Sequence, residues 1–188
     1  MVLVVVLALL PHQSQALSLS LSPAEIEEAL RYGQKAQGLP FALFAREWRA
    51  EGMQGPDQQV GGVAWLQSPF ARVAHTGWTA AHRGLSLNAE EIKRQLKDID
   101  PSLAFTVTLL SPAEQAGTYS VSLHQSGEII DPSHVEKGQD DSGDEMSWIY
   151  LYCLFPAESI NLRETVILVV TDAHGDQLPF VFDLSAIR

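Results

Sequence analysis

Residues Thr165–Thr171 read TVILVVT, residues Leu178–Leu184 read LPFVFDL, and the segment Asp172–Asp176 between them reads DAHGD. Both runs are rich in β-branched and aromatic residues, which favour strands, and the connecting segment has the composition of a turn. The first run is apolar at five successive positions, which is typical of a strand covered on both faces. We therefore predict a β-hairpin whose first strand lies in the centre of a sheet.

The residues before this hairpin contain three more runs of strand-forming residues, bounded by turn residues. They are Ala104–Leu110 (AFTVTLL), Thr118–His124 (TYSVSLH) and Trp148–Phe155 (WIYLYCLF). Their spacing predicts an antiparallel β-sandwich over residues 101–188, and an immunoglobulin-like arrangement is the form that we consider. The paired cysteines of true immunoglobulin domains are absent, because Cys153 is the only cysteine.

The residues before the sandwich carry the signals of helix starts. Ser22 is placed as an N-cap, Pro23 occupies the first helical position, and Glu25 completes a capping box. Similar signals predict a second helix that begins after Ser68 and a third that begins after Asn88. Residues 17–100 are therefore predicted to form a mainly helical region.

The segment between the first two predicted helices has an apolar pattern that fits two kinds of secondary structure. Residues 41–50 read FALFAREWRA, and their apolar positions fit both a strand and a helix. We predict a strand there, a loop over Glu51–Gly62 because it is rich in Gly, Gln and Asp, and a short strand over Val63–Leu66. The whole pattern predicts an α+β fold in which the helical N-terminal half packs on the C-terminal antiparallel β-sandwich.

Residues 1–16 have the composition of an export signal. Residues 1–10 read MVLVVVLALL, and small residues at Ser14 and Ala16 fit signal-peptidase cleavage after Ala16. The run is shorter than the roughly 20 apolar residues that span a bilayer. No Lys or Arg precedes Arg31, which departs from such signals, and a buried strand or helix is the alternative. We predict a signal peptide over 1–16 and an exported mature protein, whether periplasmic, surface-bound or secreted.

The charge of the chain bears on its partners. The sequence has 23 acidic and 12 basic residues, and its net charge of −11 argues against nucleic acid or an anionic membrane as the partner. No later segment is long and apolar enough for a membrane helix, so we expect no integral membrane segment in the mature chain.

The most acidic stretch is Glu136–Glu145, which reads EKGQDDSGDE. Asp140, Asp141, Asp144 and Glu145 offer the hard oxygen ligands that Ca²⁺ prefers, although their spacing is not that of an EF-hand loop. We keep a calcium site as a hypothesis, and a solvated acidic insertion without any cofactor as the favoured alternative.

The run 148–155 suggests a binding surface made of aromatic side chains. Alternation along a strand places Trp148, Tyr150 and Tyr152 on one face and aliphatic residues on the other. Because the aliphatic face suits the core, the three aromatic side chains would form an exposed surface for a protein or carbohydrate partner. The competing interpretation, which we favour from the sequence, is that the helical half covers this row.

No sequence motif indicates a catalytic mechanism. Cys153 lies in an apolar run, His75 and His82 are two helical turns apart, and His134 stands beside acids in a segment predicted as a loop. We therefore predict an exported, soluble, non-enzymatic binding or envelope-associated module. The alternatives are a secreted hydrolase whose site assembles only in the fold, and a calcium-stabilised β-sandwich.

Overall fold

The computed structural model of the chain describes residues 17–55, 59–85, 87, 92, 102–112, 117–140 and 146–188. The predicted signal peptide and almost all of the third predicted helix lie outside these residues. The described helices are α1 (Pro23–Lys35), α2 (Phe41–Phe44) and α3 (Pro69–His82), with short 3-10 helices η1 (Arg46–Trp48) and η3 (Ala157–Ser159). Among the described residues, no helix combines the length and apolar composition needed to cross a membrane.

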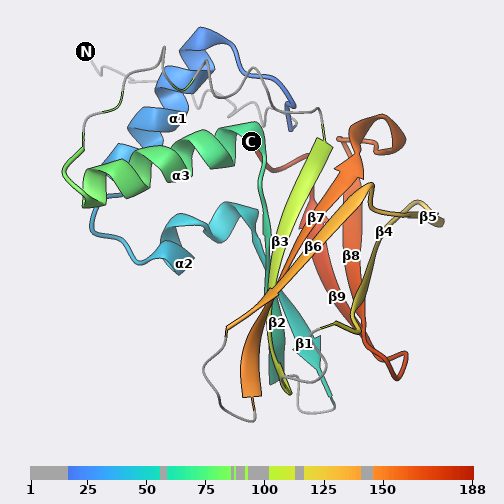
Figure 1. Cartoon of the computed structure of the whole chain (residues 1–188). Coiled ribbons are helices and arrows are strands. Elements are labelled where there is room, and N and C mark those ends of the chain that lie inside the picture. Colours follow the sequence, from blue (N-terminus) through green and yellow to red (C-terminus); the bar gives the residue numbers. More distant parts are fainter. Residues whose placement is uncertain are drawn as a thin grey trace, which may run out of the picture.

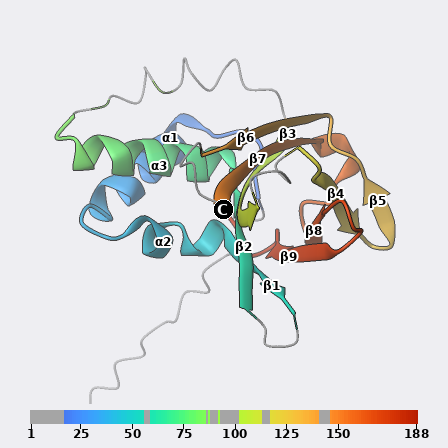
Figure 2. The same ribbon diagram turned by 60° about the horizontal axis from the view of Figure 1, so that its bottom comes forward.

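Two antiparallel sheets form the larger part of the molecule (Figures 1 and 2). One has five strands in the order β1-β2-β3-β7-β6, and the other has four in the order β5-β4-β8-β9. The strands are β1 (Arg49–Gln54), β2 (Gln59–Leu66), β3 (Ser102–Pro112), β4 (Ser120–Gln125), β5 (Glu128–Ile130), β6 (His134–Gln139), β7 (Met146–Pro156), β8 (Thr165–Thr171) and β9 (Gln177–Asp183). The chain is thus a sheet-rich α+β protein, as predicted.

The inner faces of the two sheets share one apolar core. Strand β8 lies between β4 and β9, so the predicted hairpin and the internal position of its first strand are confirmed. Phe105 on β3 contacts Phe182 on β9, with ring centroids 5.1 Å apart, and Phe155 on β7 lies 5.8 Å from Phe105. All three rings are buried, so aromatic packing joins the sheets.

The predicted helix starts at Ser22 and Ser68 are confirmed. The Ser22 hydroxyl accepts a hydrogen bond from the Glu25 amide, and the Glu25 carboxylate accepts one from the Ser22 amide, which is a complete capping box. Ser68 accepts from the Ala71 amide in the same way. Side-chain oxygens therefore satisfy amides that a helix start leaves unpaired.

Helices α1 and α3 cross at two glycines. A Cβ atom added to Gly33 would lie 1.9 Å from the Ala74 carbonyl oxygen, and one added to Gly77 would lie 2.7 Å from the Leu30 carbonyl oxygen. Only residues without a side chain allow the two backbones to approach so closely. The helices consequently bury their apolar stripes largely against each other, and they lie toward one end of the two sheets (Figure 1).

Residues 41–62 differ from the prediction. The segment predicted as a strand forms α2 and η1, because helical spacing brings Phe44 and Trp48 together in the core, with ring centroids 5.7 Å apart. The predicted loop is largely the hairpin of β1 and β2, and both strands join the five-stranded sheet. Three of its glycines, Gly52, Gly61 and Gly62, lie where a side chain would be crowded: a Cβ at Gly52 would lie 2.7 Å from the Leu178 side chain.

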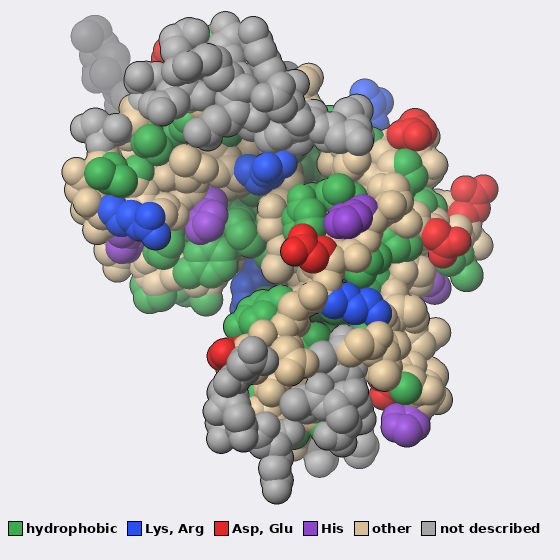
Figure 3. Space-filling view, viewed as in Figure 1, with side chains coloured by type: hydrophobic (Ala, Val, Ile, Leu, Met, Phe, Trp, Pro, Cys, Tyr) green, Lys and Arg blue, Asp and Glu red, His purple; other side chains and the backbone are tan. Residues whose placement is uncertain are grey.

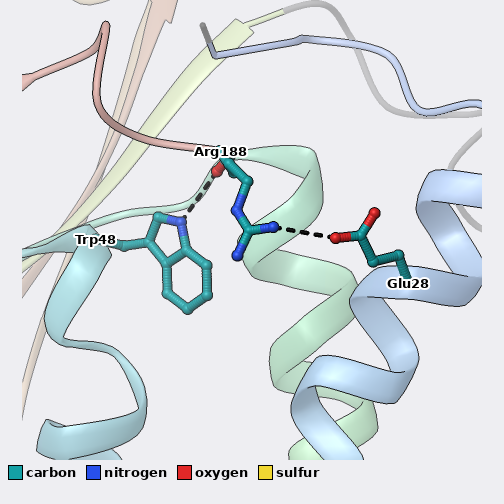
Figure 4. Close-up of polar contacts among 3 residues, drawn as sticks. All are labelled: Glu28, Trp48 and Arg188. Atoms are coloured by element: carbon teal, nitrogen blue, oxygen red, sulfur yellow. Dashed lines mark hydrogen bonds and ion pairs between the residues drawn. The ribbon is translucent and has the colours of Figure 1, made fainter. Parts of the chain in front are cut away.

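Arg188 links the chain that leaves the last strand to the helices (Figure 4). Its main-chain oxygen accepts hydrogen bonds from the Trp48 indole at 3.0 Å and from the Ser68 hydroxyl at 2.7 Å. Its guanidinium pairs with Glu28 on α1 at 3.0 Å and lies over the Phe70 ring, 5.1 Å from the centroid. One residue thus contacts α1, α3 and the segment before β1.

Candidate functional site

The outer face of β7 carries a row of aromatic side chains. The inward-facing residues Ile149 and Leu151 are fully buried, whereas Trp148 is 47% and Tyr150 is 42% exposed. Tyr152 on the same face is partly buried. The alternation predicted for this strand is therefore confirmed, and two large aromatic rings face solvent.

Neighbouring strands extend this row into a surface. On β3, Leu110 pairs with Trp148 and Thr108 pairs with Tyr150, while Gly138 on β6 lies on the other side of Tyr150. We call this surface the aromatic face. It consists of Thr106, Thr108, Leu110, Met146, Trp148, Tyr150, Tyr152, Glu136, Gly138 and Asp140.

The helical part covers only one end of this outer sheet face. Trp65 on β2 lies in the same cross-strand row as Thr106 and Tyr152, and its ring contacts Phe41 at 5.1 Å and His75 at 5.0 Å. The interpretation that the helices hide the whole row is wrong for Trp148 and Tyr150, because α1 and α3 pack mainly on each other.

Exposed apolar residues also border the face on its helical side. Leu39, Phe41 and Leu43, in and just before α2, are all exposed. Figure 3 shows hydrophobic side chains on both sides of a recess between the helical part and the sandwich. Leu110 and Met146, at the far end of the aromatic face, are 49% and 43% exposed. Exposed apolar surface of this extent is typical of an interaction site.

His75 lies where the helices meet this surface. Its ring stacks on Trp78 with centroids 5.9 Å apart and contacts Phe41 and Trp65 edge-on. Burial among these rings lowers the pKa of His75 below its usual value of 6.5. The neutral ring is thus favoured in the folded state, and the unfolded chain binds the proton more readily.

This shift predicts a pH dependence of folding. A lowered folded-state pKa contributes stability at pH values above the unfolded value of 6.5, and the contribution is lost as the pH falls below it. In urea unfolding at pH 8 and pH 5, His75→Phe is expected to lose less stability on acidification than the wild type. His174→Gln, on an exposed turn, is the control, and an equal loss in wild type and His75→Phe would contradict the assignment.

The proposed calcium site is largely outside the described residues. Asp140 is exposed and follows β6, while Asp141, Asp144 and Glu145 are not described. On the turn between β8 and β9, the Asp172 carboxylate accepts hydrogen bonds from the amides of residues 174 and 176 and so holds that turn closed. Within the described part of the chain, no group of three His, Cys, Asp or Glu side chains is placed to hold a metal ion.

The residues considered for catalysis do not share one site: His134 and Cys153 lie on adjacent strands but on opposite faces of the sheet, and His75 lies in α3. Cys153 is fully buried on the core side of β7, and burial raises the pKa of its thiol to about 12, which suppresses the thiolate. His134 begins β6, in contrast to the loop that we predicted. His75 packs among aromatic rings, as described above.

One Ser–His contact was not foreseen from the sequence. Ser122 and His124 are two residues apart on β4 and therefore share its outer face. The serine hydroxyl lies 3.0 Å from the His124 Nε2 atom. Their spacing of two residues in a predicted strand was the available signal. No described carboxylate hydrogen-bonds to His124, so the orienting group of a Ser-His-Asp triad is not in place there.

A cavity of about 270 Å³ opens at the end of the sandwich where β3 ends. Its walls combine apolar side chains such as Leu109 and Leu178 with Gln54 and the carboxylates Asp172 and Asp176. The described lining contains no His, Lys, Arg or Cys, and its hydroxyl and carboxylate groups come from Ser111, Tyr119, Asp172 and Asp176.

No family model matches the chain, and comparison with curated proteins and with solved structures gives no match. The aromatic face, argued from its own geometry, is therefore the candidate functional site.

Proposed function

We propose that this chain is an exported, non-enzymatic binding module that uses the aromatic face to bind a partner protein. The observation that carries the proposal is the exposure of Trp148 and Tyr150 beside Leu110 on an uncovered sheet face. Trp and Tyr supply much of the binding energy at protein interfaces, because their large rings lose little conformational freedom on binding. Export is proposed from the apolar run of residues 1–10 and the small residues Ser14 and Ala16 that follow it.

The neighbours of the aromatic row favour a protein over a carbohydrate. Leu110 and Met146 continue the row with exposed aliphatic and thioether groups, which suit apolar side chains of a partner. The face itself carries two carboxylates, Glu136 and Asp140, whereas Arg49 and Glu51 on β1 pair with each other at 2.7 Å. The immunoglobulin-like arrangement of the sandwich stays a proposal and does not affect this argument.

Selection from a displayed peptide library tests this proposal. The full chain is the bait, and the double variant Trp148→Ser/Tyr150→Ser is compared with Ile129→Ser/Val181→Ser, which removes exposed apolar residues from the outer face of the other sheet. We expect selected peptides to bind the wild type and the control, and to bind the aromatic double variant at least tenfold more weakly, since a lost hot spot costs about 2 kcal/mol.

Two outcomes would contradict the proposal. Selected peptides that bind the aromatic double variant as well as the wild type would place binding elsewhere, and a selection that enriches no peptide would remove the support for a protein partner. Soluble glycans are tested in parallel, and a glycan whose binding depends on Trp148 would replace the protein partner by a carbohydrate. Melting temperatures of all variants establish that each one is folded.

A further inference from the structure

Strand β6 ends the five-stranded sheet, and its outer edge has no neighbouring strand among the described residues. All of its residues except Val135 are exposed. An open edge of this kind is a template on which another chain can form main-chain hydrogen bonds. β6 also borders the aromatic row directly, because it pairs along its whole length with β7.

The register of β6 shows which main-chain groups are free. The Asp140 amide donates to the Trp148 carbonyl oxygen at 2.9 Å, and residues of an antiparallel pair exchange hydrogen bonds at every second position. Counting back from Asp140 in steps of two, Gly138 and Glu136 also bond to β7. The amides and carbonyls of the residues between them, Val135, Lys137 and Gln139, therefore point away from β7. No described main-chain group outside the sheet bonds to them.

The side chains on the outer face of β6 have a simple pattern. Glu136 lies opposite Tyr152, Gly138 lies opposite Tyr150, and the exposed Asp140 follows opposite Trp148. A Cβ atom added to Gly138 would have no heavy atom within 4 Å, so the space beside Tyr150 is open. The edge thus presents one carboxylate on each side of a gap, and the gap gives access to the Tyr150 ring.

The inner face of β6 restricts what can be added. Lys137 points toward the sandwich, and its ammonium donates to the Gly117 carbonyl oxygen at 2.9 Å, across the open side between the sheets. An inward-facing lysine on an edge strand opposes pairing with long apolar strands. An added strand is therefore expected to carry no basic residue on its inner face at this position.

Building on the proposed function, we propose that the partner is an extended basic segment that adds as an antiparallel strand to β6. Residues opposite Glu136, Gly138 and Asp140 would occupy non-hydrogen-bonded positions, where cross-strand side chains are closest. The charges then select Lys or Arg at the two outer positions. The middle position, between the two basic residues, lies opposite Gly138. Because neighbouring strands lie about 4.8 Å apart, a long apolar side chain at this position extends over Gly138 toward Tyr150.

Synthetic peptides test the chemistry of this segment. The probe has seven residues, with lysine, leucine and lysine at its second, fourth and sixth positions and threonine elsewhere, and the control probe has glutamates in place of the lysines. Fluorescence titration against the full chain is expected to show binding of the lysine probe at least tenfold tighter than that of the glutamate probe. In Glu136→Lys/Asp140→Lys this preference should reverse, and an unchanged preference would overturn the charge selection.

Gly138→Thr tests the gap separately. The new side chain meets no neighbour and suits a strand, so the fold is retained, but it fills the space over which the leucine reaches Tyr150. Binding of the lysine probe should weaken at least tenfold, whereas Gln177→Thr at the start of β9 should leave it unchanged. Equal binding by Gly138→Thr and the wild type would overturn the docking geometry.

Hydrogen exchange separates strand addition from the proposed function. The bound probe should protect the amides of Val135, Lys137 and Gln139, and no added protection there would overturn strand addition. If library peptides still depend on Trp148 and Tyr150 in that case, the aromatic face remains the binding surface and only the strand model fails. If the amides are protected but Trp148→Ser/Tyr150→Ser binds normally, the edge binds and the aromatic face does not.

Discussion

Replacing Gly33 with alanine is expected to destabilise the chain by about 3 kcal/mol, at the upper end of the usual cost of overpacking. The added Cβ would lie 1.9 Å from the Ala74 carbonyl oxygen and 2.7 Å from the Trp78 amide nitrogen. Both are backbone atoms of α3, so neither can move without displacing the helix. The two helices must separate, and the apolar stripe that they share loses contact.

Urea unfolding of Gly33→Ala followed by circular dichroism measures this effect. Gly117→Ala is the matched control, because its Cβ would have no heavy atom within 4 Å and its backbone is not in the left-handed region. We expect the control to change stability by less than about 0.5 kcal/mol. Equal stabilities of the two variants would show that α1 and α3 do not cross at Gly33.

Trp48→Ala is expected to cost about 4 kcal/mol, as is typical for removing a large buried aromatic side chain. Trp48 is fully buried, its ring lies 5.7 Å from those of Tyr32 and Phe44, and its indole donates to the Arg188 carbonyl oxygen. Trp48→Phe keeps most of the ring contact and loses the hydrogen bond, so it should cost less than Trp48→Ala.

Trp148→Ala is the matched control for this prediction, because it removes the same side chain from an exposed position on β7. We expect its free energy of unfolding to stay within about 0.5 kcal/mol of the wild type. The comparison also bears on function, since a tryptophan that adds little to stability is free to serve binding. A loss at Trp148 as large as that at Trp48 would contradict the exposed position.

The sequence predicted those features that depend on local spacing. Alternation along 148–155 placed Ile149 in the core and Trp148 outside because the side chains of a strand have a period of two. The capping residues Ser22 and Ser68 began helices because their hydroxyls satisfy amides within one turn. Such interactions lie within a few residues and can be recognised without knowledge of the fold.

Features that depend on distant residues were not predictable. Whether Phe41–Trp48 forms a helix or a strand is decided by packing against Tyr32 and Phe70. Gly52 suggested a loop, but its place in β1 is set by the Leu178 side chain, more than a hundred residues later. Exposure of the aromatic face likewise follows from the packing of α1 on α3, for which the sequence of β7 carries no signal.

Binding of a partner segment to the aromatic face can be followed through the indole N–H signals of the four tryptophans. A selected peptide is titrated into the full chain labelled with ¹⁵N. We predict that the Trp148 indole N–H resonance shifts in proportion to binding, while that of the fully buried Trp48 stays in place. A peptide that saturates the chain and leaves the Trp148 resonance unchanged would show that the aromatic face is not the binding surface.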